Sequence, residues 1–281
     1  MRRALAAWLL LAACTDPAPE GAADRRPPAG VEEAFPGRVG EAYDTVITTD
    51  EGERAVTLEL IEGAAVLEGD ILIDLETEQV SARSAGRAAT RWRWPAGAVP
   101  FEIDDTMSRT QRSTILQAVD HWNSRTAYRL RPRRAESDAV RFVPGPGCSS
   151  YVGRQGGVQK IALHPGCSTG NVIHEIGHAI GLWHEQSRSD RDDHLRVHWE
   201  NIQADRSYNF YTYQELRVDG RDLGPYDVES IMHYGSFAFS ANGLPTLTTV
   251  GGQMVSGQRQ ALTSGDILGA ARLLRDERPP E

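Results

Sequence analysis

The sequence predicts an α+β fold in which the strands of a sheet come first along the chain and a histidine-bearing helix lies behind that sheet. Short segments at 99–103, 140–143, 150–153 and 161–163 have the pattern of strands and are separated by glycine-rich turns. Residues 109–122 place four apolar side chains at helical spacing, namely Ile115, Ala118, Val119 and Trp122. Two more helices are expected, from near Asn171 to Gly181 and over 263–274. Each follows side chains with a hydroxyl group that can cap its start: Ser168 or Thr169 for the first helix, and Thr263 or Ser264 for the second.

Length and composition are those of a globular protein. The chain has 281 residues, enough for one or two domains with a substantial core. Hydrophobic residues make up 40% and charged residues 25%, which argues against wholesale disorder. The formal net charge is -9, so the basic footprint of a nucleic-acid-binding protein is missing and no nucleic-acid partner is expected.

The amino terminus has the layout of a secretory signal. Met1-Arg2-Arg3 is basic, and the apolar run 4–13 is too short to span a bilayer as a transmembrane helix. The run ends in Leu11-Ala12-Ala13-Cys14, which resembles the lipobox of bacterial lipoproteins, in which the cysteine is lipidated. The alternative is an ordinary signal peptide cut nearby, with Cys14 incidental. Both readings predict export.

Composition divides the rest of the chain. Residues 14–40 are rich in Pro, Ala, Gly and charge and predict a flexible tether after a signal peptide at 1–13. The stretch 55–74 is apolar and β-prone, and 81–89 is a small basic linker with Arg83 and Arg87 that a protease could reach. A new globular segment begins near Trp94.

Five residues predict a catalytic metal site. His174 and His178 stand at i and i+4, so a helix presents both imidazoles on one face, within reach of one Zn²⁺. Gly181 can end the helix and let the chain turn, which brings His184 back as a third ligand. Three protein ligands leave a position for water, which Glu175 could deprotonate as general base. The alternative, two satisfied core histidines, does not explain the fixed offsets of Glu175, Gly181 and His184.

This pattern, H-E-x-x-H-x-x-G-x-x-H, is the metzincin signature, and its surroundings resemble the astacin family. The carrying motifs are His184-Glu185-Gln186-Ser187-Arg188-Ser189-Asp190-Arg191-Asp192, Trp199-Glu200-Asn201-Ile202, Asn209-Phe210 and the Met-turn Ser230-Ile231-Met232-His233-Tyr234-Gly235. The resemblance covers about 94–274 and implies a metzincin-like zincin fold: a twisted N-terminal sheet, an active-site helix and a smaller C-terminal subdomain. It also implies that Met232 packs beneath the zinc and that Tyr234 stabilises the oxyanion. An ordinary core methionine and an ordinary buried tyrosine are the alternatives.

The same resemblance implies a disulfide between Cys148 and Cys167, which bracket an S-Y-V-G-R stretch found in astacins. The neighbouring edge strand of that family pairs with the peptide substrate. Two buried free thiols are the alternative. A second disulfide usual in the family is missing, because its places fall near Ala127 and Asp276.

Leu67-Glu68-Gly69-Asp70-Ile71 resembles the F-E-G-D-I stretch of astacin propeptides, in which the Asp ligates the zinc. This implies an inhibitory propeptide and activation linker at 41–88 and a catalytic domain at 89–281, with Asp70 as the zinc switch. A solvated acidic turn is the alternative. Cleavage near Arg83 or Arg87 by an activating protease would free a new amino terminus, which in the family reaches the residue equivalent to Glu185.

The sequence therefore predicts a zinc-dependent endopeptidase with protein or peptide substrates, made as a zymogen. It predicts a bacterial cell-envelope lipoprotein, attached to the membrane only through a lipid anchor on the propeptide and released upon activation. The alternatives are a non-catalytic surface lipoprotein that binds proteins or peptides and a zinc hydrolase of a non-peptide bond. The intact Glu175 and Tyr234 disfavour the first, and the substrate-pairing edge disfavours the second.

Overall fold

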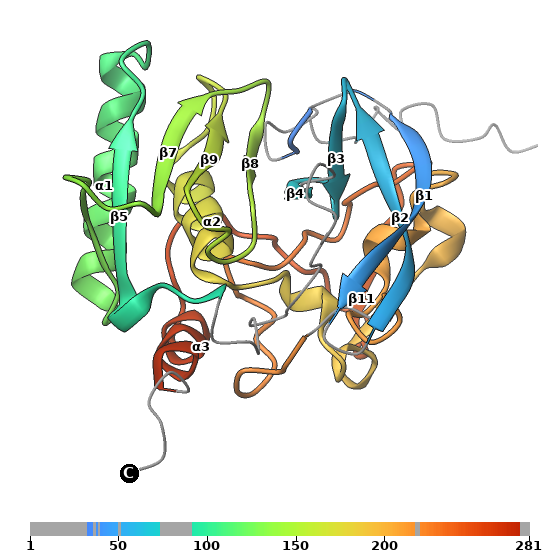
Figure 1. Ribbon diagram of the computed structural model, residues 1–281. Coiled ribbons are helices and arrows are strands. Elements are labelled where there is room, and N and C mark those ends of the chain that lie inside the picture. The colour runs from blue at the N-terminus through green and yellow to red at the C-terminus, as the bar shows by residue number, and fades with distance from the viewer. Residues whose placement is uncertain are drawn as a thin grey trace, which may run out of the picture.

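The computed structural model describes residues 33–35, 38, 40–49, 52–73, 92–216 and 220–275. The predicted signal peptide, Cys14, most of the tether, and the linker with Arg83 and Arg87 lie outside these residues. The α+β class is confirmed (Figure 1).

One nine-stranded sheet runs through the molecule in the order β1-β2-β3-β4-β8-β9-β7-β5-β6. Its first four strands come from the segment before residue 74: β1 (Glu41–Thr49), β2 (Gly52–Ile61), β3 (Ala64–Leu67) and β4 (Ile71–Ile73). The other five follow residue 97: β5 (Ala98–Ile103), β6 (Arg129–Pro132), β7 (Ala139–Pro144), β8 (Cys148–Ser150) and β9 (Val158–Leu163). The predicted propeptide thus extends the sheet of the predicted catalytic domain.

The junction between the two blocks is short. β4 pairs with β8 in parallel through Ile71 and Ser150, and the Ser150 N–H donates to the carbonyl of Asp70 at 3.1 Å. On its other side β8 is antiparallel to β9. β8 is therefore the edge strand of the second block, and β4 of the first block covers that edge.

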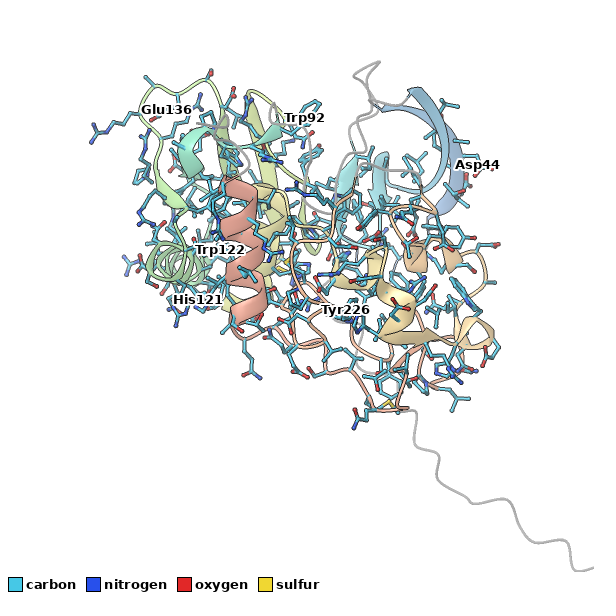
Figure 2. All side chains as sticks on the ribbon, turned by 90° about the horizontal axis from the view of Figure 1, so that it is seen from below. Asp44, Trp92, His121, Trp122, Glu136 and Tyr226 are labelled. Atoms are coloured by element: carbon cyan, nitrogen blue, oxygen red, sulfur yellow. A yellow bond between two sulfur atoms is a disulfide. The ribbon has the colours of Figure 1, made fainter. Side chains whose placement is uncertain are left out.

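Helices α1 (Arg109–Arg125) and α2 (Thr169–Ile180) lie side by side behind the catalytic block, and α3 (Ser264–Arg275) lies below them (Figure 1). Trp122 is fully buried where α1 meets α2, and its indole N–H donates to the carbonyl of Ile173 at 3.0 Å (Figure 2). The four apolar residues predicted for one face of α1 are all buried. The periodicity therefore identified the packed face correctly.

Local signals fix the ends of α2. Ser168 and Asn171 form a reciprocal capping box, which satisfies the first backbone N–H groups. At the other end Gly181 has φ of 115°, a left-handed conformation that a glycine adopts without strain. The predicted start and stop of this helix agree with the structure within two residues.

After Gly181 the chain is mostly irregular and forms the smaller C-terminal subdomain. Besides α3, its regular elements are β10 (Leu195–Val197), which pairs with β11 (Leu247–Thr249), and the 3-10 turns η3 (Glu185–Ser187), η4 (Arg191–Asp193), η5 (Trp199–Asn201) and η6 (Ser207–Phe210). A further turn, η2 (Pro95–Gly97), precedes β5. Buried Arg191 ties this subdomain together by donating to the carbonyls of Gln186 and Phe210.

The tether prediction is wrong at its end. Ala34 is 1% exposed, and its N–H donates to the carbonyl of Gly69 at 2.7 Å. It packs with Ile61 and Val66 in a small apolar cluster. Residues 33–35 therefore pack against the turn and strands that follow them. A local composition rich in Gly and Pro does not reveal this contact, because its partner lies 35 residues away. Within the described residues we find no helix with the length and apolar character needed to cross a membrane.

Candidate metal centre and active site

The three histidines meet as their spacing predicts. His174 and His178 project from one face of α2 with ring centroids 4.6 Å apart. The turn at Gly181 returns the chain so that the ring of His184 lies 5.2 Å from His174 and 4.7 Å from His178. All three side chains are buried, and Glu175 is 1% exposed beside them.

Hydrogen bonds fix which nitrogen of each ring faces the centre. The Nδ1 atoms of His174 and His178 lie 2.8 Å from the carbonyls of Ile231 and Leu182. A carbonyl oxygen can only accept, so each Nδ1 carries the proton and each Nε2 presents a lone pair. The Nε2 atoms of His174 and His184 are 3.3 Å apart. Ring nitrogens that face one another at this distance suit a shared cation.

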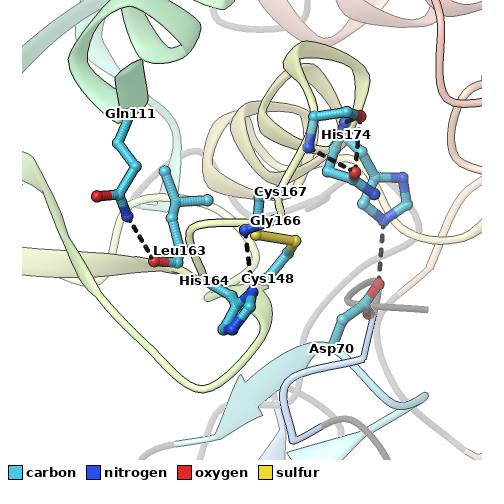
Figure 3. Close-up of a disulfide and its surroundings, with 10 residues drawn as sticks. Asp70, Gln111, Cys148, Leu163, His164, Gly166, Cys167 and His174 are labelled. Carbon is cyan, nitrogen blue, oxygen red and sulfur yellow. Dashed lines mark hydrogen bonds and ion pairs between the residues drawn. A yellow bond between two sulfur atoms is a disulfide. The ribbon is translucent and has the colours of Figure 1, made fainter. Parts of the chain in front are cut away.

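Asp70 is the fourth member of this cluster, and Figure 3 shows its carboxylate facing the ring of His174. Its Oδ2 is 3.1 Å from Nε2 of His174 and 3.3 Å from Nε2 of His184, and its Oδ1 is 3.6 Å from Nε2 of His178. The four ligand atoms lie within 4.8 Å of one another. Three imidazole nitrogens and one carboxylate oxygen are a fitting donor set for a single tetrahedral Zn²⁺.

The electrostatics of the cluster also call for positive charge. Burial lowers the pKa of His174 and of His178. Burial also works against charge on Asp70, yet the charge of His184 and hydrogen bonds from the three rings hold the Asp70 pKa well below 3.8. Burial likewise opposes a charge on His184, but Asp70 and Glu68 together raise its pKa to about 9. The carboxylate of Asp70 thus stays ionised and must be balanced by a cation or a proton at the centre.

Met232 packs against α2 at Gly177. It is 2% exposed, and a Cβ placed on Gly177 would come within 2.6 Å of its Sδ. Gly177 stands between the two histidines of α2, so only a glycine lets the methionine approach this closely. The neighbouring Ile231 carbonyl holds His174. The Met-turn therefore supports the histidines both by packing and by hydrogen bonding.

Tyr234 is buried against the third histidine, with ring centroids 4.8 Å apart. Its hydroxyl donates to the carbonyl of Glu68 at 2.5 Å. Burial, and then the charge of Asp70, raise the pKa of Tyr234 well above 10. The hydroxyl therefore stays protonated and available as a hydrogen-bond donor near the metal centre.

Glu185 faces a different space. It lines a small pocket, together with Arg188, Asp227 and Asp266. Its Oε1 accepts from the Asp227 N–H at 2.9 Å and from Arg188 at 3.1 Å, and burial, opposed by Arg188, raises its pKa to about 7. The residues from which a new amino terminus would come lie outside the described part of the chain.

Cys148 and Cys167 form a disulfide (Figure 3), so the free-thiol alternative is excluded. It joins edge strand β8 to the residue before the cap of α2. The bond therefore fixes the edge strand relative to the metal-binding helix.

Sequence reasoning missed three residues near the site. The motif resemblance assigns Glu68 no role, yet its side chain is fully buried against His184 and Ser187. Glu59 and Arg206 form a buried ion pair between β2 and the catalytic domain. A buried carboxylate or guanidinium carries no local sequence signal, because its partner lies more than 100 residues away.

Comparisons with known proteins agree with this geometry. The sequence model of the astacin family, peptidase family M12A, matches residues 86–274. Blastula protease 10 of Paracentrotus lividus is 45% identical over 186 residues, covering 62% of this chain and 31% of that protein. Protein SpAN of Strongylocentrotus purpuratus is 40% identical over 229 residues, covering 75% of this chain and 37% of that protein. The chain thus spans about a third of the length of these relatives.

A solved structure shows the same fold. High choriolytic enzyme 1 of the medaka fish Oryzias latipes, a hatching enzyme zinc-protease, superposes with a TM-score of 0.60. It is 36% identical, and the match covers 65% of this chain and 92% of that one. The metzincin-like fold is confirmed, and the chain belongs to the astacin family, peptidase family M12A.

Proposed function

We propose that this chain is a zinc-dependent endopeptidase that is made as a zymogen, exported, and directed at internal peptide bonds of proteins. The observation that carries the proposal is the buried cluster of His174, His178, His184 and Asp70, with Glu175 and Tyr234 beside it. Three of the four ligands come from the catalytic domain and one from the segment before it. Such a site suits catalysis that is switched on when the fourth ligand leaves.

The residues of the catalytic domain divide the reaction among them. Bound zinc would supply Lewis acidity, which polarises a peptide carbonyl and acidifies water. Glu175 takes a proton from the attacking water as the new C–O bond forms, and delivers it to the leaving nitrogen as the C–N bond breaks. The hydroxyl of Tyr234 donates to the charge that develops on the carbonyl oxygen. Backbone groups of β8 align the extended substrate by adding it to the sheet.

Latency follows from what the propeptide occupies. Asp70 takes the fourth place among the ligands, Ile71 pairs with the edge strand at Ser150, and the Glu68 carbonyl holds the Tyr234 hydroxyl. Metal, substrate edge and oxyanion donor are thus blocked together. The match to SpAN supports a related upstream segment. It covers 75% of this chain, which is a larger share than residues 89–281 make up, so it extends beyond the predicted catalytic domain.

We assign the remaining organisation on the sequence motifs. The signal peptide is 1–13, Cys14 is lipidated as in bacterial lipoproteins, 41–88 is the inhibitory propeptide with its activation linker, and 89–281 is the catalytic domain. An activating protease cuts near Arg83 or Arg87, and the new amino terminus reaches Glu185. Because Cys14 lies on the propeptide side, activation releases a soluble enzyme. Fractionation of cells tests this, and mature enzyme that stays lipidated would refute it.

The decisive experiment combines metal analysis with hydrolysis of a quenched peptide library before and after trypsin treatment. We expect one zinc per chain, little hydrolysis by the zymogen and strong hydrolysis after cleavage. Glu175→Ala should keep the zinc and lose nearly all hydrolysis. Substantial peptidase activity of Glu175→Ala would refute the general-base role, and zinc binding without hydrolysis after cleavage would favour the peptide-binding alternative.

A further inference from the structure

The three metal-facing rings are held from behind by different parts of the chain. The Nδ1 atoms of His174 and His178 donate to carbonyls of the catalytic domain itself. Nδ1 of His184 instead lies 2.7 Å from Oε2 of Glu68, in the predicted propeptide. One of the three ligands thus takes its supporting hydrogen bond from a segment that activation removes.

The carboxylate of Glu68 is built into this position. Its side chain is fully buried, and its second oxygen, Oε1, accepts from the hydroxyl of Ser187 at 2.8 Å. Glu68 adopts φ of 50° and Gly69 φ of 77°. A left-handed conformation is unfavourable for a non-glycine residue, because its Cβ comes too close to the following carbonyl oxygen. Glu68 occupies it in a turn that directs two side chains to the same ring.

The turn at residues 68–70 therefore contacts both ring nitrogens of His184. Asp70 approaches Nε2 at 3.3 Å from the metal side, and Glu68 binds Nδ1 from behind. A carboxylate that accepts from the back of a ligating imidazole fixes its tautomer and orientation and makes the other nitrogen more basic. Both effects strengthen metal binding by His184.

We propose that Glu68 is a positioning residue for the metal: through His184 it tightens zinc binding in the zymogen, so that the propeptide retains the metal as well as blocking it. Activation removes this support from His184 alone, because the other two rings keep their own carbonyl acceptors. The inference rests on the proposed zinc site and latency.

The test measures zinc transfer from the full-length zymogen to a chromogenic chelator. We expect Glu68→Gln to release zinc about 10-fold faster or more, the range typical of such supporting residues. Ser187→Ala, which leaves the propeptide intact, should give a smaller acceleration. The matched control is Glu62→Gln, in the preceding turn, also at positive φ but exposed; it should leave the rate unchanged.

Activation supplies an internal control. Once the propeptide has been removed, wild type and Glu68→Gln yield the same mature chain, so their zinc release rates should become equal. Equal rates in the two zymogens would overturn the proposal. Failure of the wild-type zymogen to bind zinc would refute the proposed function instead.

A second variant separates support of His184 from loosening of the propeptide. Arg206→Gln breaks the buried pair with Glu59 without touching His184. Exchange of the Ser150 amide, which donates to the carbonyl of Asp70, measures how far each variant loosens the propeptide. If Glu68→Gln accelerates zinc release no more than Arg206→Gln does for the same loosening, zinc loss reports loosening in general and the proposal fails. NMR of the zinc-loaded zymogen gives a direct signature: Glu68→Gln should shift the Nδ1–H resonance of His184 upfield and leave those of His174 and His178 in place. An unmoved His184 resonance would also overturn it.

Discussion

The ion pair between Glu59 and Arg206 should control how tightly the propeptide stays closed. Its two side chains are only 4% and 6% exposed, and it links β2 to the turn before η6. Glu59 also accepts from the Gly40 N–H at 2.6 Å. Removing one partner leaves the other charge buried without its counterion, which costs about 3–5 kcal/mol.

That cost should appear as easier opening of the propeptide, because separation of β2 lets water reach the remaining charge. At the lower end, about 3 kcal/mol, the open state becomes roughly 100-fold more populated. The assay is native-state hydrogen exchange of the inactive Glu175→Ala zymogen. It follows the amides of Ser150 and Ala34, which donate to the carbonyls of Asp70 and Gly69.

We expect Glu59→Gln and Arg206→Gln each to speed both amides by about two orders of magnitude. In the double variant the two amides should exchange more slowly than the summed free-energy effects of the single variants predict, because no charge is then left buried without its partner. Glu62→Gln removes an ion pair with Arg38 whose side chains are 50% and 65% exposed, and should change little. Unchanged exchange in both single variants, or strict additivity in the double one, would refute the reasoning.

Three further outcomes are expected. Tyr234→Phe should lower turnover of the activated enzyme by about 10²–10³, as for other oxyanion donors, with zinc content unchanged; parallel loss of zinc would indicate a structural role. Replacing Cys148 and Cys167 by Ala should lower the free energy of unfolding by about 3 kcal/mol in urea denaturation, and no change would contradict the assigned stabilisation. Asp104 has a pKa of about 2, chiefly because the side chain and backbone of Thr106 donate to it. Since this lies below its usual 3.8, the stabilisation is present above about pH 4 and is lost as pH falls through about 2. Asp104→Asn should therefore show a smaller loss of stability over that range than the wild type, and an identical loss would count against these hydrogen bonds.

Regular elements with local signals were predictable. The four-residue apolar stripe of α1, the capping hydroxyl of Ser168 and the stop at Gly181 all depend on neighbours within a few positions, so spacing alone revealed them. The tether boundary failed for the opposite reason. Ala34 is buried by contact with Gly69 and the strands beyond it, and nothing near residue 34 in the sequence signals that contact.

The metal site divides in the same way. The sequence by itself determined the three histidines, because positions i and i+4 share a helix face and Gly181 permits the return of His184. Only the tertiary structure decided what faces each ring from behind. The Nδ1 atom of His184 meets a carboxylate 116 residues earlier in the chain, and the Tyr234 hydroxyl meets a carbonyl 166 residues away. Such contacts arise because the turn at residues 68–70 packs against His184 and the Met-turn, and no local periodicity encodes them.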